Sequence, residues 1–307
     1  MKLYLFDDSV ADTWHPFSLT RPCSELLFGT SLLRERLERF AGRPTTSVLS
    51  RLWLEAYQER DAPNVIARGP LSADEERLVI SSRFVPSADA RFEGRGDTPV
   101  LLTTDDEVVG CYLPAGTAGP EQGWLESPDE GLAGAAWKTR SVDGGYVDTA
   151  WRFVAENPGR LAADLASDAA SRGGVKELPD GTWKLGSNAV ILDSDVRVEP
   201  GVVFDTRNGP VRLADRVEVR AGCRLEGPLF VGPATVLLGG AIATSSIGPV
   251  CRLRGEIEDS VVLGFANKAH DGFLGHSYLG RWVNLGAMTT NSDLKNTYGP
   301  VRIGGPD

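Results

Sequence analysis

A period of six residues governs the second half of the chain. From about residue 186, aliphatic residues recur at every sixth position, and a small or β-branched residue stands four places after each of them. Positions 213, 219, 225, 231, 237 and 243 stay in phase without a slip. An α-helix does not keep such a period, whereas sustained sixes are typical of a parallel β-helix, in which each hexapeptide forms one strand and one corner. The pattern predicts a parallel β-helix over residues 186–307.

The six-residue period slips at three places, over residues 204–213, 243–247 and 253–261. Slips of this kind predict loops that leave the coil, and loops on solenoids are common ligand sites. The final residues, Ile303 to Asp307, start another coil. We therefore expect a β-helix that is incomplete at its C-terminus, either because the chain is a fragment or because a partner subunit covers the end.

The first half of the chain, residues 1–145, has the pattern of a mixed α/β domain. The apolar run from Leu3 to Phe6 predicts a buried strand that Asp7-Asp8 ends. Apolar residues at helical spacing between Leu26 and Phe40 predict a helix that stops at Gly42-Arg43-Pro44. Further short strands are expected at 47–50, 78–80, 100–103 and 108–113. Together these elements predict an irregular, Rossmann-like domain.

Residues 146–185 are predicted to form a helical link between the two halves. A set of apolar residues shares one helical face, with a break at Pro158-Gly159 and an end at Gly173-Gly174. The members of this set are Trp151, Val154, Leu161, Leu165 and Ala169.

Charge and cysteine usage exclude several classes of protein. The net charge of -10 argues against a chain that binds nucleic acid or anionic lipid through its overall field. The 4 cysteines are scattered without a CxxC or Cys/His cluster, which favours reduced thiols over disulfides or a zinc site. The N-terminus lacks the pattern of a signal peptide, and no apolar run is long enough to cross a bilayer. We expect a cytoplasmic protein that binds neither nucleic acid nor membrane.

Four short motifs follow one another in the β-helix region. They are Ile247-Gly248-Pro249-Val250-Cys251-Arg252-Leu253-Arg254, His270-Asp271-Gly272-Phe273-Leu274-Gly275, Val283-Asn284-Leu285-Gly286-Ala287 and Asn291-Ser292-Asp293. They resemble the IGPxARLR, HLTYLG, VNIGA and NYD segments of the bifunctional N-acetylglucosamine-1-phosphate uridyltransferase/glucosamine-1-phosphate acetyltransferase family. The resemblance is still closer to the group called GlmU-like sugar nucleotidyltransferases.

This resemblance implies a left-handed β-helix, a homotrimer with active sites between subunits, and a set of site residues. His270 would be the catalytic base for transfer from acetyl-CoA, and Asn291 would orient the amine nucleophile. By the same resemblance, Arg254 and Lys295 would contact the sugar phosphate, and Asn284 and Phe273 would contact the amino sugar. Ala287 would line the acetyl-CoA channel.

The chemistry of acyl transfer suits these residue types. A protonated amine has no lone pair with which to attack a thioester, and a neutral imidazole can accept the proton near neutral pH. Other interpretations stay open. His270 can be an ordinary polar corner residue, Asn284 and Asn291 can serve as left-handed corner residues, and Arg254 can be a solvated side chain. Glu258 stands where the family has a lysine that meets the sugar phosphate, so the substrate can differ or the activity can be lost.

The N-terminal half departs from the usual nucleotidyltransferase pattern. Such enzymes follow their first strand with a basic, glycine-rich loop, whereas the first glycine here is Gly29 and Asp7-Asp8 would repel phosphate. Only Thr20-Arg21-Pro22 is similar to the family's Lys-Pro segment. Asp105-Asp106 is either a two-residue turn or a pair of Mg²⁺ ligands, and the sequence favours the turn.

The sequence therefore leaves three functions open. The leading hypothesis is acetyl or acyl transfer from acyl-CoA to an amino sugar phosphate by the β-helix. The alternatives are a sugar-1-phosphate nucleotidyltransferase, which would use Mg²⁺ in an active N-terminal domain, and a non-catalytic scaffold that binds a sugar nucleotide. In each case the ligand is a small sugar phosphate or nucleotide sugar, and no metal ligand set is assigned.

Overall fold

The computed structural model describes residues 1–94, 96–105, 107–119, 123–132, 137–175, 177–291, 296–297 and 299. The chain divides into two compact units. The first comprises Met1–Leu27 and Ser31–Arg152, and the second comprises Phe28–Thr30 and Phe153–Asp307. The helical segment after Arg152 thus belongs with the second unit, whereas the sequence pattern treats residues 146–185 as a separate link.

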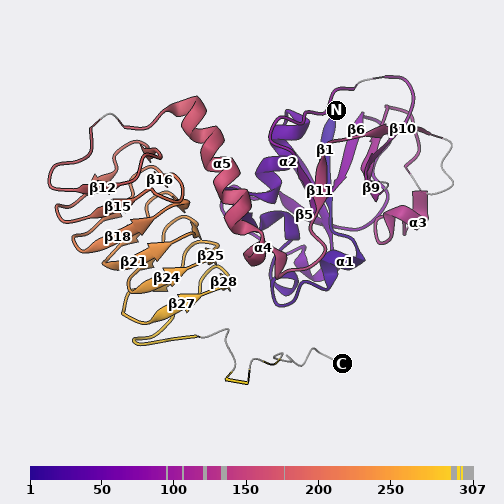
Figure 1. The fold of residues 1–307 in the computed structure, drawn as a ribbon. Coiled ribbons are helices and arrows are strands. Elements are labelled where there is room, and N and C mark those ends of the chain that lie inside the picture. The colour runs from indigo at the N-terminus through magenta and orange to yellow at the C-terminus, as the bar shows by residue number, and fades with distance from the viewer. Residues whose placement is uncertain are drawn as a thin grey trace. The chain divides into compact units, whose positions relative to one another are not determined.

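The first unit is built on a mixed sheet of 7 strands among the described residues, which confirms the expected α/β domain (Figure 1). The central strand β1 pairs in parallel with β4 on one side and with β6 on the other, and β5 extends the parallel part beyond β4. β9 runs antiparallel to β6 and to β8. In sheet order the strands are β10 (Lys138–Ser141), β8 (Val100–Thr104), β9 (Glu107–Leu113), β6 (Arg77–Ser81), β1 (Lys2–Phe6), β4 (Thr45–Ser50) and β5 (Asn64–Ala67).

Both faces of this sheet are covered, because side chains of β1 alternate between two apolar clusters. Leu3 and Leu5 pack with residues of helix α2 (Leu33–Ala41) on one face. Phe6 packs with Trp124 and with helix α3 (Pro128–Leu132) on the other face. The smaller elements of the unit are α1 (Ser9–Asp12), β7 (Phe84–Pro86) and β11 (Gly144–Tyr146), and the short pair β2 (Leu27–Phe28) and β3 (Ser31–Leu32) runs across the division between the units.

The first helix begins later than the apolar spacing predicts. The pattern includes Leu26 and Leu27 in the helix, but α2 starts at Leu33, after the hairpin of β2 and β3. The side chain of Glu35 accepts a hydrogen bond from the backbone N–H of Leu32 at 2.9 Å, and this contact caps the start of the helix. The predicted end is confirmed, because Gly42 adopts φ 67°, a left-handed conformation that favours glycine at a helix terminus.

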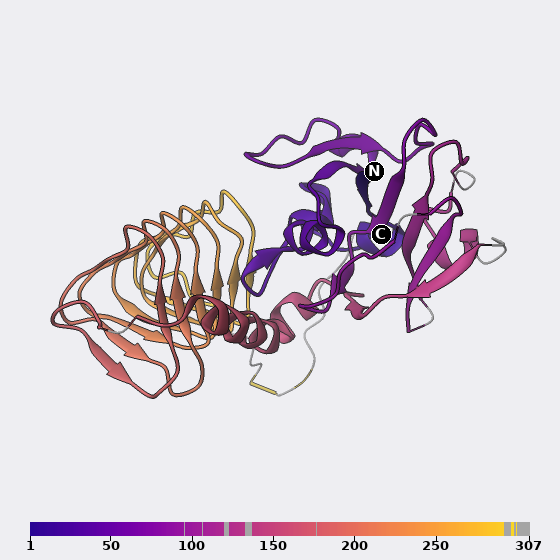
Figure 2. The same cartoon turned by 90° about the horizontal axis from the view of Figure 1, so that it is seen from above.

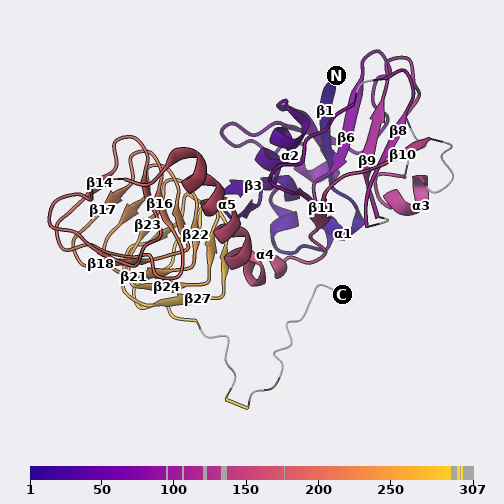
Figure 3. The same ribbon diagram turned by 45° about the horizontal axis from the view of Figure 1, so that its top comes forward.

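The second unit contains three parallel sheets, the arrangement of the expected left-handed β-helix (Figures 1 and 3). Among the described residues the first sheet consists of β12 (Trp183–Leu185), β15 (Val203–Asp205), β18 (Cys223–Glu226), β21 (Gly240–Ala243), β24 (Glu256–Glu258) and β27 (Phe273–Gly275). The second consists of β13 (Val190–Leu192), β16 (Val211–Leu213), β19 (Leu229–Val231), β22 (Ser246–Ile247), β25 (Val261–Val262) and β28 (Tyr278–Leu279). The third consists of β14 (Arg197–Val198), β17 (Glu218–Val219), β20 (Val236–Leu237), β23 (Arg252–Leu253) and β26 (Asn267–Lys268).

The aliphatic positions of the repeat form the core of the β-helix, as the period predicts. Leu237 pairs in register with Leu253, and both side chains are fully buried. Figure 2 shows the coils stacked on one another from orange to yellow. The predicted loops at the phase slips are wrong. Ala243 pairs with Glu258 while Asp205 pairs with Glu226, so the slips are shorter or longer corners within the stack.

Helix α5 (Asn157–Arg172) lies along the β-helix, after the short α4 (Arg152–Ala155). Its buried Leu161 and Leu165 pack against Ala214 and Phe230 of the coils. The predicted break is confirmed, because α4 ends at Ala155 and α5 begins at Asn157, which places Pro158 in the first turn of α5, where its missing N–H needs no partner. Trp151 precedes the helices and is 72% exposed, so its predicted place on the apolar face is wrong. In the described part of the chain, no helix is long and apolar enough to cross a membrane.

Candidate functional site

The carboxyl ends of four parallel strands bring charged residues to one edge of the first unit's sheet. Asp7 and Asp8 follow β1, Arg51 follows β4, Arg68 follows β5, and Arg83 comes two residues after β6. The chain proceeds from β1 to β4 and β5 on one side, then returns to β6 on the other side of β1. Such a reversal of strand order creates a crevice at the carboxyl ends, where α/β proteins bind their ligands. We call these residues, with Asp12 of α1, the carboxyl-edge cluster.

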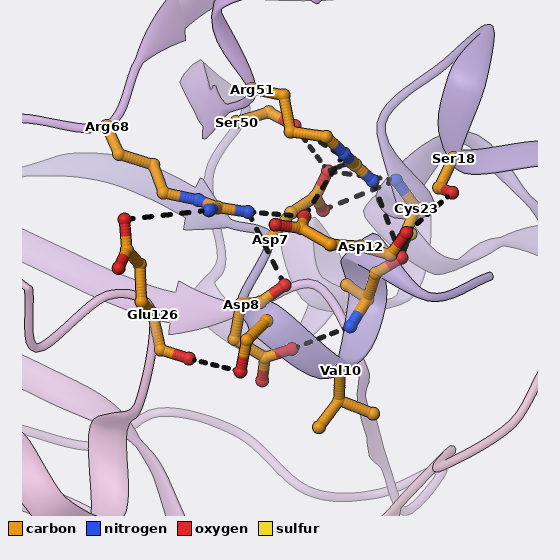
Figure 4. A network of polar contacts seen from close by, with 12 residues as sticks. Asp7, Asp8, Val10, Asp12, Ser18, Cys23, Ser50, Arg51, Arg68 and Glu126 are labelled. Carbon is orange, nitrogen blue, oxygen red and sulfur yellow. Dashed lines mark hydrogen bonds and ion pairs between the residues drawn. The ribbon is translucent and has the colours of Figure 1, made fainter. Parts of the chain in front are cut away.

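Asp7 lies at the centre of the carboxyl-edge cluster and is completely buried. Its carboxylate accepts hydrogen bonds from Ser50 Oγ at 2.6 Å, from Arg51 Nη1 at 3.3 Å and from the backbone N–H of Cys23 at 3.3 Å (Figure 4). Burial raises the pKa of this carboxyl, and the charge of Arg51 and the hydroxyl of Ser50 oppose the rise. Asp7 is thus anchored from three segments and joins them.

Asp8 forms a second buried ion pair, with Arg83. Arg83 Nε donates to both carboxylate oxygens at 2.8 Å, and Nη2 lies 2.7 Å from Oδ2. The guanidinium also donates to the carbonyl of Val147 and lies over the ring of Tyr146, 4.7 Å from its centroid. Burial alone would lower the pKa of Arg83, but the hydrogen bonds and charge of Asp8 raise it. Asp8 Oδ1 additionally caps α1 by accepting from Ala11 N–H at 2.9 Å.

Asp12 connects the two remaining arginines of the cluster. Arg51 Nε lies 3.1 Å from Asp12 Oδ1, and Arg68 Nη2 donates to the same oxygen. Arg68 also faces Glu126 at 4.0 Å, a longer contact to a side chain that is 62% exposed. Figure 4 shows Arg51 and Arg68 converging on these carboxylates from different strands. The expectation that Asp7-Asp8 would repel phosphate is therefore wrong, since both carboxylates are paired with arginine.

The described carboxylates of this edge do not fit a metal ion. Every oxygen of Asp7 and Asp8 already accepts a hydrogen bond or faces a guanidinium. Within the described residues, no group of three acidic, histidine or cysteine side chains could hold one. Thr104 of β8 pairs with Glu107 of β9, so the two antiparallel strands are joined by a short connection, which agrees with the turn that the sequence favours. Asp105 has φ 45°, and Asp106 lies outside the described residues.

Arg21, in the segment similar to the family's Lys-Pro motif, has a structural partner. Only 5% of it is exposed, and its guanidinium contacts both carboxylate oxygens of Glu59 at 3.2 and 3.3 Å. The neighbouring Glu25 is also buried and pairs with Arg34 of α2 at 2.5 Å. These pairs hold the segment after α1 against the domain.

In the second unit, one corner of the β-helix brings together three of the predicted site residues. Arg254, His270 and Ala287 each follow a segment of the third sheet, on successive coils. Arg254 Nε donates to Asp271 Oδ1 at 3.0 Å, and the backbone N–H of Met288 donates to the Asp271 carbonyl at 2.9 Å. His270 and Ala287 are exposed.

The other predicted residues of the β-helix lie on its faces. Asn284 Oδ1 accepts from Asn267 Nδ2 at 2.5 Å. Asn291 uses its whole amide on the coil before it, because Nδ2 donates to the Gly275 carbonyl and Ser277 Oγ while Oδ1 accepts from Gly275 N–H. Phe273 opens β27, and Lys295 lies outside the described residues. Asn291 thus has a structural role whether or not it also meets an amine.

The sequence analysis missed a buried lysine behind this corner. Lys268 is 1% exposed and occupies a core position in register with Leu253. Its Nζ donates to the carbonyls of Arg254, His270 and Gly272 at 2.8, 3.2 and 2.8 Å. Burial lowers the pKa of this ammonium. The repeat predicts an aliphatic residue at position 268, and the lysine found there is the signal that could have identified this site. The three hydrogen bonds of Lys268 fix the backbone that carries His270.

The first unit is an α/β domain whose charged cluster lies at a reversal of strand order, and a β-helix follows it. Comparison with known families agrees with this class: the family model described as sugar nucleotidyl transferase matches residues 3–172. This match spans more than half of the chain, and the chain belongs to the sugar nucleotidyl transferase family. It contains the whole carboxyl-edge cluster and ends before the β-helix.

Proposed function

We propose that the first unit transfers a nucleotidyl group from a nucleoside triphosphate to a sugar 1-phosphate at the carboxyl-edge cluster. The observation that carries the proposal is the convergence of Arg51, Arg68 and Arg83 at the reversal of strand order, within the region that matches the family. In the reaction, a phosphate oxygen of the sugar forms a bond to the α-phosphorus. The bond from that phosphorus to the bridging oxygen breaks, and pyrophosphate leaves with the electron pair.

The arginines differ in how well they can reach a phosphate. Arg51 has 2% of its side chain exposed and serves the internal pairs, whereas Arg68 and Arg83 keep 15% and 14% exposed. The contact of Arg68 with the exposed Glu126 is the longest of the cluster, at 4.0 Å. A phosphate can replace Glu126 as the partner of Arg68, and the buried carboxylates then keep their own ion pairs. We therefore assign the first phosphate contact to Nη1 of Arg68, the nitrogen that faces Glu126.

Replacing Arg68 with methionine is expected to lower kcat/KM for pyrophosphate release by roughly ten- to a hundredfold, because a hydrogen-bonded charge contact is lost. The assay supplies UTP or dTTP, a sugar 1-phosphate and magnesium. Arg60→Met is the matched control, since Arg60 has 88% of its side chain exposed in the same unit. A wild-type rate in Arg68→Met, or no pyrophosphate with any nucleotide, would count against the proposal.

A second activity, acyl transfer from acetyl-CoA to an amino sugar phosphate, is favoured by the corner that carries Arg254, His270 and Ala287. Lys268 fixes the backbone of this corner, while the imidazole of His270 stays exposed to a ligand. The imidazole would take the proton of the attacking amine as the nitrogen bonds to the acyl carbon and the thiolate of coenzyme A leaves. As in the resembling family, this proposal places the site between subunits of a homotrimer.

For this activity, His270→Ala is expected to reduce thiol release from acetyl-CoA by about a hundredfold or more, the usual contribution of a general base. The melting temperature should stay unchanged, because the side chain is exposed. His276→Ala is the matched control, since His276 is also exposed but lies at a different corner, facing Asp259. Equal rates of thiol release in the two variants would show that His270 is not the general base.

A further inference from the structure

A small pocket lies in the first unit, beside the carboxyl-edge cluster. Its volume is about 110 Å³. The walls come from the loop after β5, from β6, from the end of β9 and from the segment before α3. The residues that matter for its chemistry are Arg68, Arg77, Gly119, Trp124 and Glu126.

Arg77 differs from three other buried arginines of this unit, Arg21, Arg34 and Arg51. Arg21, Arg34 and Arg51 each pair with a carboxylate. Arg77 is 1% exposed, yet in the described part of the chain no carboxylate lies within ion-pair distance of it. Its Nη1 donates to the Leu71 carbonyl at 3.2 Å and its Nη2 donates to the Thr117 carbonyl, while Nε has no hydrogen-bond partner among the residues that the structure describes.

A buried guanidinium without a counter-ion is unfavourable, because two carbonyl dipoles do not replace the hydration of a full charge. The same burial lowers the pKa of Arg77. Arg68, which also lines the pocket, has a buried Nε that finds no hydrogen-bond partner in the described part of the chain. Among the described lining residues Glu126 is the one acidic side chain, and it faces Arg68 and is 62% exposed.

The walls leave room for a small group beside Arg77. A Cβ added at Gly119 would lie 4.0 Å from Arg77 Nη1, so a larger residue there would occupy the approach to the guanidinium. Pockets for drug-sized molecules span about 300–1,000 Å³. The pocket is much smaller and admits a single tetrahedral anion rather than a nucleoside.

We propose that this pocket is a binding site for one phosphoryl group, with Arg77 as the buried cation and Arg68 as the link to the carboxyl-edge cluster. The phosphoryl group can belong to inorganic phosphate or to the end of a larger ligand, and both present the same oxygens to the guanidinium. The inference does not rest on nucleotidyl transfer, because binding is measured without turnover.

The test is the melting temperature of the full chain during titration with inorganic phosphate, at ionic strength held constant with potassium chloride. Wild type should gain on the order of 5 °C at a phosphate concentration about a hundredfold above Kd. Arg77→Met should lose this gain while melting at or above the wild-type temperature without phosphate. Arg60→Met, which removes the same charge from an exposed site, should keep it.

Absence of any phosphate-dependent gain in wild type, or an equal gain in Arg77→Met, would overturn the proposal. If Arg77→Met fails to fold, Arg77→Lys takes its place, with ³¹P line broadening as the readout. An affinity at least tenfold weaker than wild type is then expected, and an unchanged affinity overturns the site. Parallel titrations with a sugar 1-phosphate and a nucleoside triphosphate identify the source of the phosphoryl group. Pyrophosphate release, assayed separately, can succeed or fail independently of this result.

Discussion

Replacing Arg83 with methionine should destabilise the first unit by about 3–5 kcal/mol, the usual consequence of removing one partner from a buried ion pair. The Asp8 carboxylate has 2% of its side chain exposed and would lose three contacts from the guanidinium. Methionine can fill part of the space over Tyr146, but it cannot neutralise the charge left behind. Urea unfolding, followed by the fluorescence of the unit's tryptophans, measures the loss of unfolding free energy.

The double variant Asp8→Asn/Arg83→Met separates the cost of an unpaired buried carboxylate from the cost of the lost packing. It removes the uncompensated carboxylate, and asparagine can still cap α1 through Ala11 N–H. We expect it to recover most of the stability lost in Arg83→Met, which gives a large coupling energy in the double-mutant cycle. A loss below about 1 kcal/mol in the single variant would mean that the pair behaves like an exposed one.

The β-helix was predictable because its signal is local. Each coil places an aliphatic residue at every sixth position, so the period along the sequence is enough to predict the stack of coils. The phase slips marked where the corners change length, but the backbone conformations of the corners were not predictable. Val250, for instance, adopts φ 56° at a corner, a conformation that is unusual for a β-branched residue. The stacked coils impose that turn on it, and nothing in the local pattern indicates it.

The carboxyl-edge cluster could not be recognised as a motif, because its arginines lie far apart in the sequence. Arg51, Arg68 and Arg83 belong to separate segments and meet only because β1, β4, β5 and β6 run parallel. A usable signal did exist, since each follows closely after a short apolar run. When the order of the strands is not known, Asp7 and Asp8 are interpreted as unpaired negative charges. Their partners, Arg51 after β4 and Arg83 after β6, reverse that interpretation.

The sequence analysis also missed two buried charged residues. Lys268 occupies a position of the repeat where an aliphatic residue is expected, Arg77 directly precedes the strand predicted at 78–80, and both are 1% exposed. Propensity and period cannot tell a buried cation from a solvated one, because the difference depends on which carbonyls and carboxylates surround it. Lys268 is satisfied by three carbonyls. Arg77 has two carbonyl partners and a pocket beside it.

Leu253→Ala should destabilise the second unit by about 3–5 kcal/mol, the upper part of the range for such substitutions. Leu253 is fully buried and lies between Leu237 and Lys268 in one column of the core. Its neighbours cannot move into the cavity, because backbone ladders hold the coils on both sides in register. In a solenoid the loss weakens the contacts of one coil with both neighbours, so the damage is concentrated there.

Hydrogen exchange tests this localisation. Amide protection should fall most in β23 and in the coils that follow it, while the first unit keeps its wild-type protection. Leu185→Ala is the matched control, because it is the same chemical change in β12 at a residue that is 40% exposed, and its loss should stay below about 1 kcal/mol. Equal losses of unfolding free energy in the two variants, or a uniform fall in protection across both units, would show that the stacked core residues do not determine the stability of the β-helix. A confined loss would show that each coil is held chiefly by its immediate neighbours, so that the corner carrying His270 depends on the core beneath it.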